Sequence, residues 1–342
     1  MSAHNSTHRY ERTVLLSVER VEAPVVVTSA ELDERLSEVY RRTRMRAGLL
    51  ENLVGIRERR RWADDGSFID GAVAAGRAAL AASGVPAADI GLMINSSLSR
   101  EWLEPSTAVV IHDALDLSPA CRNFDVTNAC LGFINGMEIA ASMIEAGLID
   151  HALVVDSEDS QPVQEATIKR LSSTDVTAND LMREFAALTL GSGAVAVVLG
   201  RGDQHPEGHR LVAGVNRAAT QHHELCVGDN DVMKTDLKGL LEAGLDLSAD
   251  LWSESAREHG WDGGISRYFL HQISQVHTDA ICVRLDIEPD LVPRTFPDFG
   301  NIGPASVAFT LAGSADELEP GDRVLLMGIG SGLNASCLEI RW

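Results

Sequence analysis

Apolar residues recur along this chain with two periods, one typical of strands and the other typical of helices. Runs of apolar and β-branched residues predict strands at 14–27, 90–96, 124–127, 151–156, 187–200 and 268–271, and a strand–turn–strand at 324–340. Apolar residues at helical spacing predict helices at 29–40, with Ser29 as its N-cap, and at 69–84, 129–146, 237–258 and 276–285. This alternation favours an α/β fold in which helices pack on sheets.

A short internal repeat indicates that the chain consists of two related halves. A Gly-Ser-Gly triplet at 191–193 is followed by Ala196 and Leu199, and a second triplet at 330–332 is followed by the same residue types at the same spacing. Self-similarity of this kind is expected after a duplication. We therefore predict an N-terminal half at residues 1–202 and a C-terminal half at residues 203–342, joined by a polar stretch around Pro206.

The charge of the chain limits its partners. Its 342 residues include 50 acidic and 29 basic ones, which gives a formal net charge of −21. Such a surface repels nucleic acids and anionic lipids, so neither is expected as a partner. An anionic substrate would need a local basic patch, and Arg57, Arg59, Arg60 and Arg61 are the candidate, with a solvated turn as the alternative.

The lack of a recognisable targeting signal and the spacing of the cysteines favour a cytoplasmic protein. The first 20 residues have no apolar run of signal-peptide length, and no apolar stretch of roughly 18 residues suggests a membrane span. The five cysteines are scattered without CxxC spacing. This pattern argues against a disulfide framework or a zinc site, so we expect no bound metal and a reducing compartment.

Cys130 is the strongest candidate for chemistry. It lies where the predicted strand at 124–127 turns into the helix at 129–146. A cysteine at a helix start faces unpaired N–H groups and the positive end of the helix dipole, which lower its pKa and favour the nucleophilic thiolate. The alternative is an inert core cysteine.

Four other positions are candidates, each with an ordinary structural alternative. His271 ends an apolar strand, Asn301 lies between two glycines in a turn and has an amide that can donate to an oxyanion, and the glycine turn ending at Gly332 can present backbone N–H groups. Glu104 precedes a proline and is expected to mark a helix start. The alternatives are a core histidine, a turn asparagine, a tight hairpin and a surface carboxylate.

Four motifs in combination resemble the ketoacyl synthase III group of the thiolase superfamily. They are Asn-Ala-Cys-x-Gly-Phe at 128–133, His-Gln-x-Ser at 271–274, Gly-Asn-x-Gly-Pro-Ala-Ser at 300–306 and Gly-x-Gly-Ser-Gly-Leu-Asn at 328–334. The resemblance implies a five-layered αβαβα thiolase fold made of two duplicated halves, and a homodimer. It implies that Cys130 is acylated, that His271 and Asn301 form one oxyanion hole, and that the backbone N–H groups of Cys130 and Gly332 form another.

Within the group the chain most resembles the OleA branch, through segments that include Leu-Glu-Pro-Ser-Thr at 103–107. That branch condenses two fatty acyl-CoA molecules without decarboxylation, giving a 2-alkyl-3-ketoacyl-CoA or the β-keto acid, as the first step of long-chain olefin biosynthesis. By this resemblance Glu104 reaches into the partner's active site and removes the α-proton. No cofactor is implied beyond the coenzyme A thioesters, and downstream olefin-pathway enzymes are possible partners. The tryptophan of the usual coenzyme A clamp has no match here, which leaves the coenzyme A contacts unassigned.

Several other functions agree with part of this pattern. A decarboxylating 3-oxoacyl-ACP synthase III would use malonyl-ACP and would need Cys130, His271 and Asn301 but not Glu104. One subunit of a heterodimeric β-lactone synthase is a second alternative, although nucleophile and base both occur in this chain. A redox-sensing thiol protein would need Cys130 alone. A lipid-binding scaffold would tolerate Cys130→Ser.

Overall fold

The computed structural model describes residues 4–173 and 175–342, so residues 1–3 and 174 of the predicted N-terminal half lie outside it. Within the described residues, ten strands are connected by hydrogen bonds into one continuous sheet. They are β1 (Ser6–Arg9), β2 (Thr13–Glu22), β5 (Leu92–Asn95), β6 (Arg122–Asp125), β7 (His151–Glu158), β8 (Gly193–Arg201), β9 (His209–Ala218), β12 (Arg267–Leu270), β13 (Arg323–Gly330) and β14 (Asn334–Arg341). Their order is β12-β13-β14-β9-β2-β8-β7-β5-β6, and β1 also pairs with β9.

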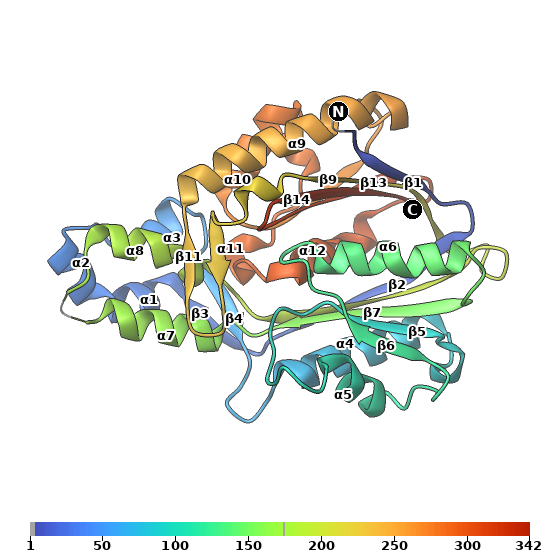
Figure 1. Ribbon diagram of the computed structural model, residues 1–342, viewed down its shortest axis with the longest axis horizontal. Helices are drawn as coiled ribbons and strands as arrows, with labels where there is room; N and C mark the ends of the chain where they lie inside the picture. Colours follow the sequence, from blue (N-terminus) through green and yellow to red (C-terminus); the bar gives the residue numbers. More distant parts are fainter. Residues whose placement is uncertain (1–3, 174) are drawn as a thin grey trace.

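The sheet is connected by only a short pairing where β2 meets β9. Between these two strands Val14 pairs with Arg210 and Leu15 pairs with His209. On one side of this pairing the sheet continues from β2 through β8, β7, β5 and β6. On the other side it continues from β9 through β14, β13 and β12. Figure 1 shows the two groups as separate layers, with α6 (Gly132–Glu145) and α12 (Ser306–Ser314) between them.

Helices also cover the two outer faces. In Figure 1, α4 (Phe68–Ser83) and α5 (Thr107–Ala114) lie below the β7 layer, and α9 (Leu237–His259) and α10 (Gln275–Leu285) lie above the β9 layer. The order of layers is therefore αβαβα, which confirms the predicted fold class. The central helices are the most apolar because a sheet covers them on each side, and Phe133, Met137 and Phe309 are completely buried there.

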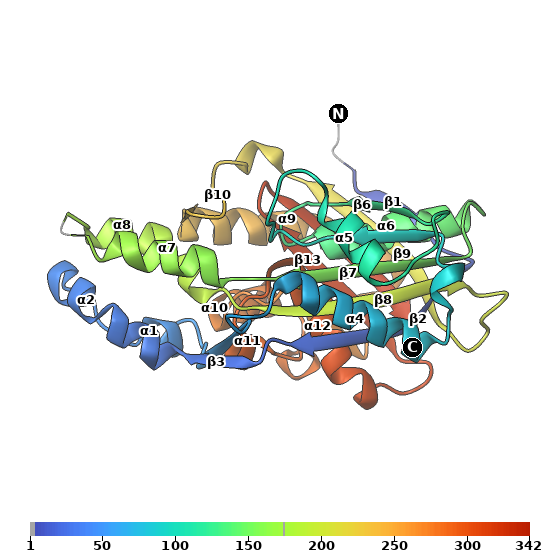
Figure 2. The same cartoon turned by 90° about the horizontal axis from the view of Figure 1, so that it is seen from below.

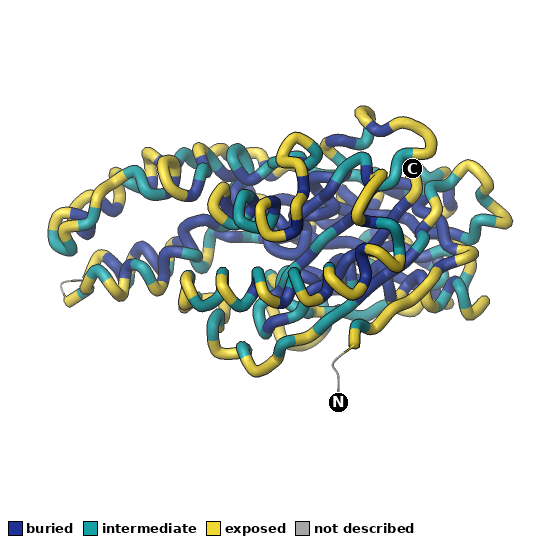
Figure 3. Tube along the Cα trace, turned by 90° about the horizontal axis from the view of Figure 1, so that it is seen from above, coloured by how far each residue is buried: buried dark blue, intermediate teal, exposed yellow. Residues whose placement is uncertain are grey.

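A helical arm projects from one end of the layered body and was not predicted as a separate feature (Figure 2). Its helices are α1 (Ser29–Arg35), α2 (Ser37–Thr43), α7 (Gln161–Leu171) and α8 (Ala178–Glu184). Leu32, Leu36 and Leu181 are buried in its own small core, and Figure 3 shows exposed residues along its outer side. This arm is thin, since two helical layers bury only one face of each helix.

The remaining described elements are short. Two further two-stranded sheets pair β3 (Val25–Thr28) with β4 (Glu58–Arg61) and β10 (Cys226–Gly228) with β11 (Met233–Thr235). The short helices are α3 (Leu49–Asn52), α11 (Phe296–Phe299), η1 (Ala87–Asp89), η2 (Phe185–Thr189), η3 (Thr220–His222), η4 (Pro289–Leu291), η5 (Gly303–Ala305) and η6 (Ala315–Glu317). No helix of the described part has the length and apolar character needed to cross a bilayer.

The predicted strands and helices are largely confirmed, with five corrections. The strand predicted at 14–27 is two strands, β2 and β3, separated by Ala23 and Pro24. Thr28, not Ser29, caps the first helix, because Thr28 and Glu31 form a capping box while the Ser29 hydroxyl donates to the carbonyl of Ile56 at 2.5 Å. That helix also ends at Arg35, and α2 follows. The strand predicted at 187–200 begins at Gly193, after η2. The helix predicted at 129–146 begins at Gly132.

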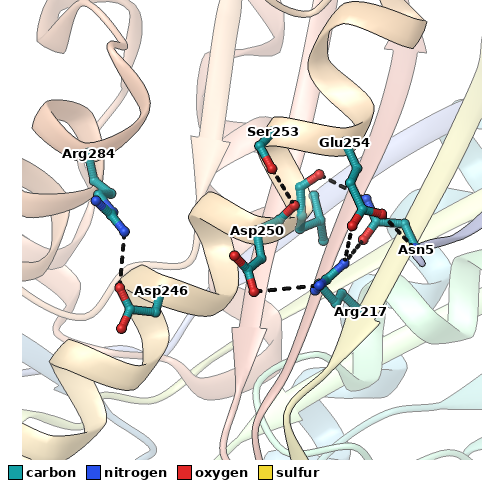
Figure 4. A network of polar contacts seen from close by, with 8 residues as sticks. Asn5, Arg217, Asp246, Asp250, Ser253, Glu254 and Arg284 are labelled. Carbon is teal, nitrogen blue, oxygen red and sulfur yellow. Dashed lines mark hydrogen bonds and ion pairs between the residues drawn. The ribbon is translucent and has the colours of Figure 1, made fainter. Parts of the chain in front are cut away.

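The N-terminal strand packs on the C-terminal layer. Arg217 on β9 donates to Asn5 and to Glu254, both at 2.9 Å, and the backbone nitrogen of Asn5 donates to Glu254 at 3.0 Å (Figure 4). Asp250, one turn earlier on α9, also faces Arg217 (Figure 4). These contacts connect the start of the chain to α9 and β9. The division into halves at residues 202 and 203 stays a prediction.

Candidate active site

Three of the predicted residues line one cavity of about 800 Å3. Cys130 comes from the turn between β6 and α6, His271 directly follows β12, and Asn301 lies between α11 and η5. These segments are far apart in the sequence, and the two sheet layers bring them together. A nucleophile, an imidazole and an amide beside one cavity can attack a carbonyl carbon and stabilise the oxyanion that forms.

The turn that carries Cys130 has an unusual backbone. Ala129 has a φ of 45°, a left-handed conformation that costs free energy for a residue with a Cβ. A glycine is also required at position 132, three residues later, because a Cβ on Gly132 would lie 2.9 Å from the carbonyl oxygen of Ser96. Asn128 supports the turn, since its side chain donates to Asn135 at 2.8 Å. The tight turn places Cys130 at the cavity wall, before the helix instead of within its first turn.

The expected lowering of the Cys130 pKa is wrong. The pKa of the thiol is raised to about 12, chiefly by burial and to a smaller extent by the nearby Cys226, Glu158 and Asp156. Desolvation therefore outweighs the dipole of α6, which begins only at Gly132. The thiol must lose its proton as it attacks a substrate, because little thiolate is present beforehand.

His271 is a neutral imidazole in this cavity. Burial lowers its pKa to about 3, and His277 contributes to the lowering. Among the described residues, Nδ1 of His271 has no hydrogen-bond partner, while the backbone nitrogen donates to Met327 at 2.9 Å. A neutral imidazole has one N–H donor and one acceptor nitrogen, so it can donate to an oxyanion or accept a proton.

Asn301 is oriented by its own loop. Its side-chain oxygen accepts a hydrogen bond from the backbone nitrogen of Gly303 at 3.0 Å. Its backbone nitrogen donates to Thr189, and its carbonyl accepts from Gly191, each at 2.9 Å. With the oxygen held in this way, the amide nitrogen is the group that can donate to a substrate oxygen.

The last glycine turn also reaches the cavity. Gly330 and Ser331 line it, and a Cβ on Gly330 would lie 2.9 Å from the carbonyl oxygen of Asn128. The turn therefore packs directly against the turn that carries Cys130. Gly332 follows with a φ of 129°, which favours glycine.

Glu104 does not line the cavity. It lies on the segment between β5 and α5, with an exposed side chain. The N-cap position of the next helix is Ser106 and not Glu104, and the Ser106 side chain makes no capping hydrogen bond. The neighbouring Leu103 is 94% exposed and Trp102 is 50% exposed. Within one chain, the predicted base is thus separate from the predicted nucleophile.

The predicted basic patch is not present as such. Arg59 is fully buried and donates to the hydroxyl of Ser29 and the carbonyl of Leu188. The other three arginines each form an ion pair, and their partners are Asp298 for Arg57, Glu58 for Arg60 and Asp64 for Arg61. The segment is the strand β4 and not a turn. Three of these four charges are paired with carboxylates and the fourth is buried, which leaves less charge for an anionic substrate.

Sequence reasoning missed several residues of the cavity wall. Glu158, Cys226 and His277 line it, and an apolar wall comes from one side of α9. The leucines of that wall are Leu237, Leu240, Leu241, Leu245 and Leu251. Their helical spacing was visible in the sequence, but a stripe of leucines is equally typical of a helix that packs on a core.

The chain matches known proteins over almost its whole length. Residues 124–215 match the family described as 3-oxoacyl-[acyl-carrier-protein (ACP)] synthase III, and residues 259–342 match the C-terminal part of that family. An acyl-CoA:acyl-CoA alkyltransferase of Xanthomonas campestris is 42% identical, over 97% of this chain and 99% of that protein. A beta-ketoacyl-[acyl-carrier-protein] synthase III of Streptomyces coelicolor is 28% identical, over 86% of this chain and 84% of that protein.

A solved structure extends this similarity to the fold. It is a cysteine-to-serine variant of Xanthomonas campestris OleA with bound lauric acid and lauroyl-CoA, and it matches with a TM-score of 0.95 and 41% identity, over 97% of this chain and 100% of that chain. Other structures of the same OleA have a replaced glutamate or a replaced histidine. The chain therefore belongs to the 3-oxoacyl-[acyl-carrier-protein] synthase III family of the thiolase superfamily, together with the OleA-type acyl-CoA:acyl-CoA alkyltransferases.

Proposed function

We propose that this protein joins two fatty acyl-CoA molecules by a non-decarboxylative Claisen condensation. The product is a 2-alkyl-3-ketoacyl-CoA or the corresponding β-keto acid, and the reaction is the first step of long-chain olefin biosynthesis. The observation that carries this proposal is the cavity that combines Cys130, His271 and Asn301 with the apolar wall of α9. A fatty acyl chain fits such a wall because burial of each methylene contributes about 0.8 kcal/mol.

The first half-reaction uses Cys130. The sulfur attacks the thioester carbonyl of the first acyl-CoA, the acyl group is transferred to Cys130, and coenzyme A leaves as the thiol. The tetrahedral oxyanion is stabilised by the backbone N–H groups of Cys130 and Gly332. This step agrees with the high pKa of Cys130 if the thiol proton leaves as the carbon–sulfur bond forms and passes to the sulfur of the departing coenzyme A, which leaves as the thiol.

The second half-reaction needs a carbanion. We propose that Glu104 of the partner subunit removes the α-proton of the second acyl-CoA and that the amide of Asn301 and the ring of His271 stabilise the enolate oxygen. The α-carbon then attacks the acyl group on Cys130 and releases the thiol. A solvated glutamate, with a pKa near 4.3, is a weak base for this proton, so it must be buried against acyl chains when it acts.

Two observations support the role of Glu104. The glutamate and the cysteine replaced in the OleA structures are the same number of residues apart as Glu104 and Cys130. In addition, the exposed Trp102 and Leu103 beside Glu104 are the kind of side chains that a partner subunit covers. We accordingly propose a cytoplasmic homodimer that works without a cofactor and passes its product to later enzymes of the olefin pathway.

Product analysis by mass spectrometry tests this function. The pure protein is incubated with a long-chain acyl-CoA alone, then with added malonyl-ACP. A coupled ketone or β-keto acid from the acyl-CoA alone, absent with Cys130→Ala and with Glu104→Ala, is the expected result. A product that forms only with malonyl-ACP and survives Glu104→Ala would instead identify a decarboxylating synthase.

A further inference from the structure

Two carboxyl groups on one side of β7 reach the region of Cys130. Asp156 and Glu158 are two residues apart on the strand, so their side chains point the same way. Asp156 is completely buried, and Glu158 is 7% exposed and lines the cavity with Cys130. The chemistry proposed above does not use either group, although two buried carboxyls in contact are costly to keep.

Glu158 holds the start of the segment that leads to Glu104. Its carboxylate accepts hydrogen bonds from the backbone nitrogen of Leu98 at 2.6 Å, the backbone nitrogen of Ser99 at 3.1 Å and the hydroxyl of Ser99 at 2.6 Å. Both carboxylate oxygens are used in these contacts. The hydroxyl of Ser99 also accepts from the backbone nitrogen of Asp159 at 2.8 Å, which continues the attachment along β7.

Further contacts extend this attachment toward β5. Asp156 accepts from the hydroxyl of Ser96 at 2.5 Å, and the hydroxyl of Ser97 accepts from the backbone nitrogen of Ser157 at 2.9 Å. Residues 96–99 are thus fixed to the end of β7 one after another. Four residues separate Ser99 from Glu104 along the chain, which limits how far Glu104 can move.

The other end of the segment is fixed by a different carboxylate. Asp125, at the end of β6, accepts from the backbone nitrogens of Thr107 and Ala108 at 3.1 and 2.9 Å and from Arg100 at 3.2 Å. Glu104 lies between these two attachments. Of the two carboxylates, Glu158 is the one whose side chain lines the cavity of Cys130.

We propose that Glu158 is a positioning residue for the condensation, because it holds the 96–106 segment in the register that presents Glu104 to the partner subunit. This inference rests on the proposed function, since it assigns the work of Glu158 to the step in which Glu104 acts. Acylation of Cys130 does not need that step. Loss of the Glu158 carboxylate is therefore expected to separate the two half-reactions.

The electrostatics of the pair agree with this role. Burial raises the pKa of Glu158 to about 7, while the donors on Ser99 and Leu98 lower it. Burial and the neighbouring Glu158 also raise the pKa of Asp156. Burial thus disfavours the charge on both carboxyls, and the three donors from Leu98 and Ser99 favour the charged form of Glu158.

The test uses Glu158→Gln in the full-length protein. A glutamine side chain has one acceptor oxygen instead of two, so its NH2 group faces the backbone nitrogen of either Leu98 or Ser99, and part of the anchor is lost with little change in volume. Hydrogen exchange measured by mass spectrometry reports the segment at 96–106. Single-turnover release of coenzyme A reports acylation, and mass spectrometry reports the condensed product.

The expected result has three parts. Exchange at 96–106 becomes faster, acylation does not fall, because loss of the Glu158 charge favours the Cys130 thiolate, and condensation falls by about 100-fold, as a displacement of about 1 Å can produce. Glu158→Asp keeps the charge and is expected to recover part of the condensation. Glu165→Gln on α7, which removes an exposed ion pair with Arg35, is the matched control and should change none of the three.

Other results would overturn the proposal. Unchanged exchange at 96–106 in Glu158→Gln contradicts the anchoring, and an equal loss of acylation and condensation assigns Glu158 to the general stability of the site. If the wild type forms no condensed product from acyl-CoA alone, the proposed function itself has failed. Exchange at 96–106 then still decides whether Glu158 holds the segment.

Discussion

The cavity that contains Cys130 and the segment that carries Glu104 differ in burial. The cavity is built from both sheet layers and encloses Cys130, His271 and Asn301. The segment lies outside the cavity and exposes Glu104 together with Leu103. One chain therefore gathers the candidate nucleophile and the candidate oxyanion donors but leaves the proposed base on its surface. From this difference we expect that one chain is enough for acylation, whereas the proposed condensation needs a second copy.

Removal of the nucleophile is expected to have the largest effect. Cys130→Ala abolishes the release of coenzyme A and the formation of condensed product, because no other group can hold the acyl chain. Stopped-flow detection of free thiol measures the release. Cys282→Ala, a change in the buried core of the C-terminal layer, is the control and should keep both activities. Normal release from Cys130→Ala would assign the acyl group to another residue.

Replacement of the base is expected to separate the half-reactions. Glu104→Gln keeps the release of one coenzyme A per Cys130 and lowers condensation by about 100-fold or more, since general base catalysis contributes about 10²–10⁴-fold. Mass spectrometry of the intact protein should show that the acyl-enzyme accumulates.

Mixing two inactive variants sharpens this test. In a dimer of one Glu104→Gln subunit and one Cys130→Ala subunit, one active site has both an intact cysteine and an intact partner glutamate. Random pairing should restore about a quarter of the wild-type activity. No recovery in mixed dimers would place the base in the same chain as the nucleophile.

A change at the surface of the segment is expected to have a smaller effect. Leu103→Asp places a charge where we expect the partner subunit, and it should weaken the dimer by about 1–3 kcal/mol. Sedimentation velocity measures the dimer fraction. The stability of the monomer should change by less than about 0.5 kcal/mol, because Leu103 is 94% exposed. An unchanged dimer would show that the interface lies elsewhere.

The smallest expected effect tests the burial of the cavity. The pKa of His271 in the folded protein, about 3, lies below its ordinary value, so the unfolded chain binds more protons between these two values. The free energy of unfolding should therefore decrease as the pH falls from about 6.5, by at most about 1.4 kcal/mol per pH unit from this group. Urea unfolding at pH 7 and pH 5 measures it, and His271→Asn should show a weaker decrease. Equal pH dependence in both proteins would mean that His271 is hydrated.

The pattern of apolar positions was enough to predict most elements of the fold. The periods of two and 3.6 residues arise from local backbone geometry, so they identified α4, α9 and the strand pair β13 and β14 without any tertiary information. The errors occurred where a tertiary contact decides a boundary. Ser29 does not cap its helix because its hydroxyl is used by Ile56, which is remote in the sequence.

The candidate site residues were predictable where a local motif marks them and not where only a tertiary contact does. Cys130, His271 and Asn301 stand in compact motifs, and the structure places all three beside one cavity, while their roles stay predictions. Glu158 has no motif of its own. What indicates its role is a set of three hydrogen bonds from Leu98 and Ser99, which lie some sixty positions away in the sequence. Such contacts exist only after folding.

Residue types at fixed local spacing were enough to predict an α/β fold of helices packed on sheets, the family motifs and the candidate nucleophile. The five-layered αβαβα order was predicted only through the family resemblance that those motifs carry. The tertiary structure alone decided the protonation of the site. Desolvation between the two sheet layers raises the pKa of Cys130 and lowers that of His271, opposite to what the start of a helix predicted for the thiol. It also decided that Glu104 stays outside the cavity of its own chain, because burial depends on how the layers assemble.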